Sequence, residues 1–191
     1  MQRLSNRFLA VLLSGVFFLW ASSALAEKKF ENSDDAKEKD EPQKFLPDYD
    51  KLVAGKDADW VYFPTGNGLK GFKTVTVKDF GDTGRGRDSR DAAKDGQEYM
   101  EQWLEREGFK IEKSGAEVTI EGNVCNAWEP SGGARFWGGW YASPGVCLEV
   151  IAKDSKGNIV AEVRQKAKGS TIRDAVENGL EDVAKSLAKG R

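Results

Sequence analysis

Five segments of this chain carry apolar or β-branched residues at alternate positions, a pattern typical of β-strands with one buried face. A sixth, 60–63, is a short apolar run that ends at Pro64. Two further segments repeat apolar residues at intervals of three and four, as amphipathic helices do. The sequence therefore predicts an α+β fold, a two-layer sandwich with two amphipathic helices on one face of a mainly antiparallel sheet of five or six strands. The expected strands span 60–63, 72–80, 109–112, 117–126, 146–153 and 159–163.

The ends of the two expected helices are marked by residues that commonly cap helices. Asp88 or Ser89 is the expected N-cap of the first helix, and Gly108 follows its last turn. Thr171 precedes the second helix, and Asp174 three residues later completes a capping pair.

The first 26 residues have the three parts of a secretory signal peptide. Arg3 and Arg7 provide the positive start, 8–20 is largely apolar, and Ala24-Leu25-Ala26 fits a cleavage site. The alternative is a retained membrane helix, but the apolar run is shorter than the ~20 residues that a span needs. We therefore expect a periplasmic or secreted protein without a transmembrane anchor after signal cleavage.

The residues after the expected cleavage site divide into a charged segment and one domain. In 27–44, 12 of 18 residues are charged and one Phe is the only large apolar residue, so we expect a disordered charged linker. Residues 45–191 then form a single α+β domain. The mature chain has 27 basic and 31 acidic residues and therefore a net charge of −4, which argues against binding to nucleic acid.

The chain has no histidine and only two cysteines. This composition excludes Ser-His-Asp and Cys-His catalysis, and it excludes His-ligated metal and haem sites. Two cysteines are also too few for a Cys₄ zinc or iron–sulfur site within one chain. We expect no metal and no cofactor, and the sequence singles out no catalytic residue.

A glycine-rich loop with several arginines leads into the first expected helix. A strand, such a loop and a helix N-terminus in that order can form an anion-binding nest, with the arginines as counter-charges. The alternative is a solvated loop whose arginines are balanced by neighbouring aspartates. The candidate anion-binding residues are Gly84, Arg85, Gly86, Arg87, Ser89 and Arg90.

The segment between the two cysteines is rich in aromatic residues and glycine. Such a loop could form a stacking surface for sugars, peptides or another protein. The alternative is a small satellite core in which the rings pack on the sheet or on one another. The candidate partner-binding residues are Trp128, Arg135, Phe136, Trp137, Trp140 and Tyr141.

Strand parity predicts a disulfide between Cys125 and Cys147. Each cysteine lies on the strand face opposite the main apolar residues of its own strand. A register that sets Cys125 opposite Cys147 also brings Val124 near Leu148, so one pairing satisfies both the bond and the core. The bond would close a loop of about 22 residues and contribute ~3 kcal/mol. Two free thiols are the alternative.

Several segments together resemble a family of bacterial envelope proteins of unknown function, mostly predicted lipoproteins. The resemblance implies an extracytoplasmic interaction module and supplies no catalytic residues. A similar architecture occurs in the N-terminal domain of TolB-type proteins and in lipoproteins that activate cell-wall synthases. This chain departs from the lipoprotein members because it lacks the lipobox cysteine. The resembling residues are Phe45-Leu46-Pro47-Asp48-Tyr49-Asp50-Lys51-Leu52, Val61-Tyr62, 73–77, and the hairpin at 148–163 with its Lys156-Gly157 turn.

Two functions remain open at this point. The first is an exported, non-catalytic binding module whose partner is an envelope protein or a cell-wall component. The second is a hydrolase or transferase that uses paired carboxylates on cell-envelope material. Aspartate and glutamate are plentiful, but no spacing singles out an acid–base pair.

Overall fold

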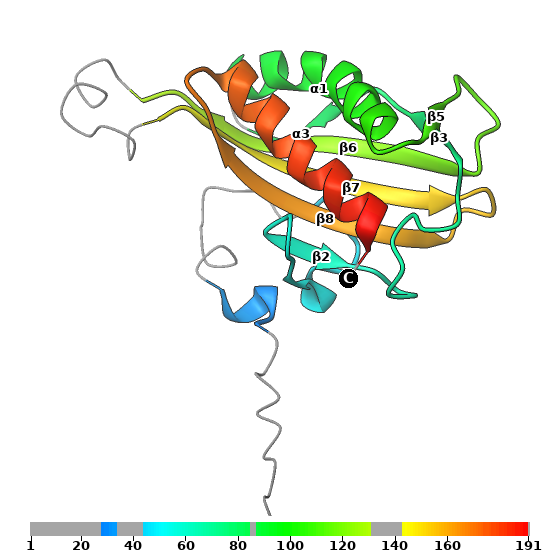
Figure 1. Cartoon of the computed structure of the whole chain (residues 1–191). Helices are drawn as coiled ribbons and strands as arrows, with labels where there is room; N and C mark the ends of the chain where they lie inside the picture. The colour runs from blue at the N-terminus through cyan, green and yellow to red at the C-terminus, as the bar shows by residue number, and fades with distance from the viewer. Residues whose placement is uncertain (1–27, 34–43, 85–86, 131–142, 191) are drawn as a thin grey trace, which may run out of the picture.

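The computed structural model describes residues 28–33, 44–84, 87–130 and 143–190. Two α-helices, α1 (Arg87–Arg106) and α3 (Ile172–Lys189), lie side by side on one face of a sheet (Figure 1). The predicted α+β class and the placement of both helices on one face are therefore confirmed. Within the described part of the chain, neither helix is long and apolar enough to cross a membrane.

The sheet has eight strands in the order β1-β2-β8-β7-β6-β3-β5, and β4 also pairs with β6. Three long strands, β6, β7 and β8, form an antiparallel centre that runs under both helices (Figure 1). The strands are β1 (Val53–Ala54), β2 (Trp60–Tyr62), β3 (Thr74–Val77), β4 (Gly81–Asp82), β5 (Lys110–Ile111), β6 (Val118–Trp128), β7 (Gly145–Asp154) and β8 (Ile159–Lys168).

The prediction of five or six mainly antiparallel strands needs correction, because the sheet is mixed and has eight. β3 pairs in parallel with β5 and β6, and β4 pairs in parallel with β6. The chain passes through α1 between β4 and β5, and a helical crossover returns the chain in the same direction. β1 and β4 have two residues each, which is too short for alternation to reveal them.

The main core lies between the helices and the sheet. Phe80 packs into a space left by two glycines, Gly96 on α1 and Gly122 on β6. A Cβ atom at Gly122 would lie 2.2 Å from the Phe80 ring, so the ring requires glycine there. The fully buried core side chains include Val118, Ile120, Val124, Leu148 and Val150 from the sheet, and Met100, Leu104, Leu180, Val183 and Leu187 from the helices.

The start of α3 is as predicted, and the start of α1 is not. The Thr171 side chain accepts a hydrogen bond from the Asp174 backbone N–H at 3.1 Å, which caps α3. α1 begins at Arg87, one residue before Asp88 and two before Ser89, so both lie in its first turn. Ser89 is fully buried there, which a solvent-facing cap residue would not be.

The sheet face away from the helices is covered by two N-terminal segments, residues 28–33 and 44–52, which we call the N-terminal cover. Residues 28–33 belong to the predicted charged linker, and in the structure they contact the domain. Phe30 and Leu46 of this cover are buried against Trp60 of β2, and the Phe30 and Trp60 ring centroids lie 5.4 Å apart. One aromatic ring thus anchors a segment that is otherwise charged.

Backbone pairing holds the same segment in place. The Phe30 N–H donates to the Leu52 carbonyl oxygen at 2.9 Å, and the Ala54 N–H donates to the Lys28 carbonyl oxygen at 3.0 Å. Residues 28–30 therefore extend the sheet edge at β1. Because backbone groups make these bonds, the charged side chains remain in solvent at little cost.

Candidate functional site

The predicted disulfide between Cys125 and Cys147 is confirmed, and both residues are fully buried. Val124 pairs with Leu148 as expected. The register then shifts, and Asn126 instead of Cys125 stands opposite Cys147. Cys125 is the extra residue of a β-bulge, so the expectation that the two cysteines are directly opposed needs correction.

Beyond the bulge, β6 and β7 stay paired as far as Trp128 and Gly145. This end of the two strands extends past the beginning of α3 (Figure 1). Trp128 packs on its own hairpin, because a Cβ atom at Gly145 would lie 2.1 Å from the Trp128 ring. The half-buried Trp128 therefore serves partly as a structural clamp. The other candidate partner-binding residues, Arg135, Phe136, Trp137, Trp140 and Tyr141, lie outside the described residues.

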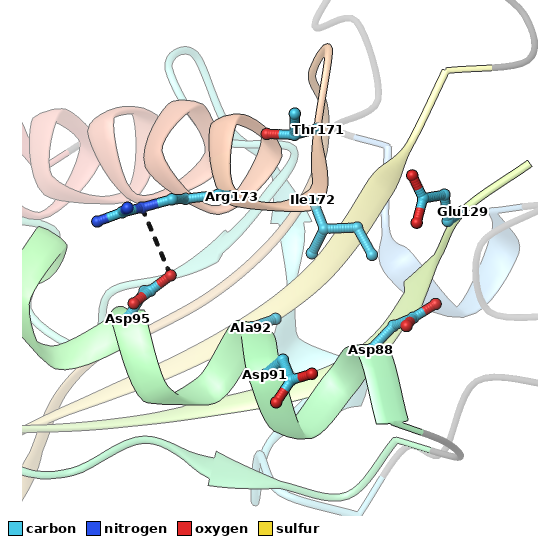
Figure 2. Close-up of a pocket in the computed structure, with 8 residues that line it drawn as sticks. All are labelled: Asp88, Asp91, Ala92, Asp95, Glu129, Thr171, Ile172 and Arg173. Atoms are coloured by element: carbon cyan, nitrogen blue, oxygen red, sulfur yellow. Dashed lines mark ion pairs between the residues drawn. The ribbon is translucent and has the colours of Figure 1, made fainter.

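A pocket of about 310 Å³ lies beside this hairpin, at the N-terminal ends of both helices, and we call it the acidic pocket. Glu129, directly after β6, brings the hairpin into its wall. In Figure 2 the Ile172 side chain points toward Ala92, between the two helices. The pocket is lined by Asp88, Asp91, Ala92 and Asp95 of α1, Glu129, Thr171, and Ile172 and Arg173 of α3.

The acidic pocket carries four carboxylates and one guanidinium. Arg173 forms an ion pair with Asp95, with Nε and Oδ2 3.6 Å apart (Figure 2), and its Nε donates a hydrogen bond to the Tyr99 hydroxyl. Tyr99 and then Asp95 raise the pKa of Arg173, which keeps it charged. Asp91 in turn pairs with Lys94 at 2.6 Å. The lining still contains more acidic than basic side chains, which favours cationic groups over anionic ones.

The carboxylates of the acidic pocket do not form a metal centre. Among the residues that the structure describes, no group of three or more acidic or cysteine side chains is arranged to hold a metal ion. The side chains of the pocket can form ion pairs and hydrogen bonds with a polar ligand.

Some groups of the predicted anion nest already make contacts within the protein. The Gly84 N–H donates to Asp82 Oδ1 at 2.9 Å and to the Val124 carbonyl oxygen at 3.1 Å. Ser89 is buried, and Arg90 is exposed on another cavity. Arg85 and Gly86 lie outside the described residues, and only the backbone of Arg87 is described, so anion binding by the arginines stays a prediction.

A buried charged cluster, which the sequence did not predict, lies on the covered sheet face. Arg164 on β8 and Glu149 on β7 are both fully buried and form an ion pair. Glu149 also accepts hydrogen bonds from the Tyr49 hydroxyl at 2.7 Å and from Asn123 Nδ2 at 3.3 Å. Burial raises the pKa of Glu149, and the Arg164 charge opposes that shift.

The same cluster contacts the disulfide. Arg164 Nη1 lies 3.5 Å from Cys125 Sγ. The strand parity of Glu149 matches that of Cys147, so the sequence does place both on one face. It gives no sign that this face is covered, because the covering residues lie about 100 positions earlier in the chain.

Comparison with known proteins identifies solved structures with a similar fold, but it assigns the chain to no family. No family model matches the chain, and no curated protein matches it. The fold is that of PelC from Paraburkholderia phytofirmans, solved as a dodecamer. That structure has a TM-score of 0.50 and 15% identity, and the alignment covers 69% of this chain and 98% of PelC.

Two other solved structures are similar to a smaller degree. A second PelC dodecamer from the same organism, a variant, has a TM-score of 0.48 and 17% identity, with 69% of this chain and 98% of PelC covered. A DUF4136 family protein from Bacteroides thetaiotaomicron has a TM-score of 0.38 and 13% identity, with 67% of this chain and 94% of that protein covered.

Proposed function

We propose that this chain is an exported, non-catalytic binding module of the bacterial envelope, whose partner is an envelope protein or a cell-wall component. The observation that carries the proposal is the buried disulfide between Cys125 and Cys147. Disulfides persist in oxidising compartments such as the periplasm, and this chain begins with the features of an export signal. The proposed location is therefore periplasmic or extracellular.

The disulfide also supports a binding role for the segment it encloses. It fixes the two strands at the base of the 128–145 hairpin, where Trp128 and Gly145 make the last pair. Tryptophan and tyrosine are the residues that most often dominate binding energy at interfaces, and the enclosed sequence supplies both. A loop with fixed ends loses less conformational entropy when it binds.

The acidic pocket lies at the base of the same hairpin. Glu129, the residue after β6, lines the pocket together with acidic residues of α1. A partner that binds at this end of the hairpin would therefore meet several acidic side chains. Such a partner would carry lysine, arginine or amino groups near an apolar or sugar surface. Envelope proteins and peptidoglycan both offer this combination.

The second candidate is a carboxylate-dependent hydrolase or transferase that acts on cell-envelope material. The specific observation in its favour is that Asp88, Asp91, Asp95 and Glu129 line one pocket, although they are not grouped by any motif in the sequence. Paired carboxylates are the groups that glycoside hydrolysis uses. Turnover of peptidoglycan that is lost in Asp95→Asn would favour this function.

Binding to purified peptidoglycan and to solubilised envelope protein tests the first proposal. We expect the wild-type chain to bind one of them, and Trp137→Ala/Trp140→Ala to weaken that binding at least about tenfold, as loss of interface anchors does. The variant should retain the thermal midpoint of the wild type. Trp103→Ala, at the far end of α1, is the control and should bind like the wild type per folded molecule.

Two results would contradict the proposal. One is a double variant that binds as tightly as the wild type. The other is a midpoint lowered by roughly the 3–5 kcal/mol of a truncated aromatic core, with binding per folded molecule unchanged. That second result would assign the aromatic residues to a satellite core.

A further inference from the structure

The N-terminal cover is attached to the sheet through two carboxylates. The Tyr49 hydroxyl donates to Glu149 Oε1 at 2.7 Å, and the Asp48 backbone N–H donates to Glu162 Oε2 at 3.2 Å. In the other half of the cover, the Phe30 ring centroid lies 5.4 Å from the Arg164 guanidinium carbon. The charge state of these sheet residues therefore bears directly on whether the cover stays in place.

The two carboxylates differ in the number of hydrogen bonds and ion pairs that they make. Glu149 is paired with Arg164 and accepts two further hydrogen bonds. Glu162 is just as buried, but its Oε1 has no hydrogen-bond partner, and it makes no ion pair among the described residues. A buried carboxylate with so little compensation favours its neutral, protonated form.

The surroundings of Glu162 reinforce this preference. Burial raises the pKa of Glu162 to about 7, and the Asp48 and Asp50 charges act in the same direction. The hydrogen bond from the Asp48 amide and the Lys51 charge oppose the shift. The groups that face Glu162 include Asp48, Asp50 and Lys51 of the cover, Tyr62 of β2 and Ile151 of β7. Arg164, two residues along β8, lies on the same sheet face and is paired with Glu149.

We propose that the N-terminal cover is a pH-sensitive lid on the charged face of the sheet, closed most firmly when the Glu162 carboxyl is protonated and loosened when it ionises. In the closed state the ionised carboxylate is buried next to two aspartates of the cover. When the cover lifts, water solvates the carboxylate and the aspartates move away. Ionisation of Glu162 therefore favours the open state.

The direction of the pH effect follows from the raised pKa. In the open state Glu162 has the ordinary glutamate pKa near 4.5, and in the closed state its pKa is about 7. Closure is therefore fully favoured below about pH 4.5, and it weakens as the pH rises to 7 and above. This inference concerns the covered sheet face and stands independently of the partner-binding proposal.

Amide hydrogen exchange of the full mature chain tests the lid. Peptides that span 44–54 are compared at about pH 5.5 and about pH 8, each corrected for intrinsic exchange, with α3 peptides as the internal reference. We expect the opening equilibrium of the cover to increase roughly tenfold or more at the higher pH, while α3 changes little.

Two variants identify the titrating group. Glu162→Gln, which is always neutral, should give equal protection of 44–54 at both pH values. Glu121→Gln is the control on the same sheet face, because Glu121 is paired with Lys78 and Lys153 and does not touch the cover. Its pH response should match the wild type. A wild-type change below about twofold, or an equal response in Glu162→Gln, would overturn the proposal.

Discussion

Arg164→Met is expected to lower the free energy of unfolding by about 3–5 kcal/mol, the usual cost of removing one partner from a buried ion pair. Arg164 is fully buried and is the cation that faces the fully buried Glu149. Its removal leaves Glu149 with two hydrogen bonds and no counter-charge, and it also removes the cation from beneath Phe30. Chemical denaturation at pH 7, followed by circular dichroism, measures the loss.

Two further variants separate charge from packing. Glu149→Gln/Arg164→Met removes both charges and should recover part of the loss, because no unpaired buried charge remains. Lys153→Met is the control for an exposed pair. Lys153 and Glu121 are both partly exposed, so its cost should stay within about 1 kcal/mol. If Arg164→Met cost no more than Lys153→Met, the description of a buried charged cluster would be wrong.

Cys125→Ala/Cys147→Ala is expected to lower the free energy of unfolding by ~3 kcal/mol. The bond closes a loop with a sequence separation of 22, and its removal restores conformational entropy to the unfolded chain. Alanine is the appropriate replacement because both positions are fully buried and a serine hydroxyl would lack partners. Denaturation of the oxidised wild type and of the variant gives the difference.

The reduced wild type is the matched reference for this pair. It should lose a similar amount of stability, because the chain-entropy difference is the same. A variant as stable as the oxidised wild type would contradict a stabilising bond. Two reactive thiols per denatured, non-reduced wild-type chain would show that the bond does not form.

The elements that the sequence predicted well are those with long, regular patterns. Both helices and the long strands β6, β7 and β8 follow from their apolar periodicity, and parity on β6 and β7 was enough to pair Cys125 with Cys147. β1 and β4, with two residues each, carry no period at all. The bulge at Cys125 was also missed, because an extra unpaired residue leaves no mark in the alternation.

The 28–33 segment of the N-terminal cover and the buried charges could not be predicted from local composition. A segment with one phenylalanine among charged residues has too little apolar surface to fold alone. Phe30 is buried only because Trp60, Leu46 and Ile151 from distant segments surround it. Arg164 and Glu149 look like solvent-facing strand residues until that cover is in place.

The acidic pocket also could not be predicted from local sequence. The acidic pocket combines the first turns of α1, the residue after β6 and the start of α3, three segments that only the fold brings together. The arginines and aromatic residues that the sequence singled out flank these segments in the chain. Sequence patterns thus missed the pocket, and the roles of the arginines and aromatic residues stay predictions.

Export is the claim on which the disulfide, the location and the envelope partner all depend, and one mass measurement tests it most directly. The chain is expressed with its own N-terminal segment in a bacterium with an outer membrane, and the periplasmic fraction and medium are analysed intact without reductant. We expect a species that begins at Glu27 and is lighter by two hydrogens than its reduced form. A cytoplasmic species that still begins at Met1 and carries two free thiols would contradict the account.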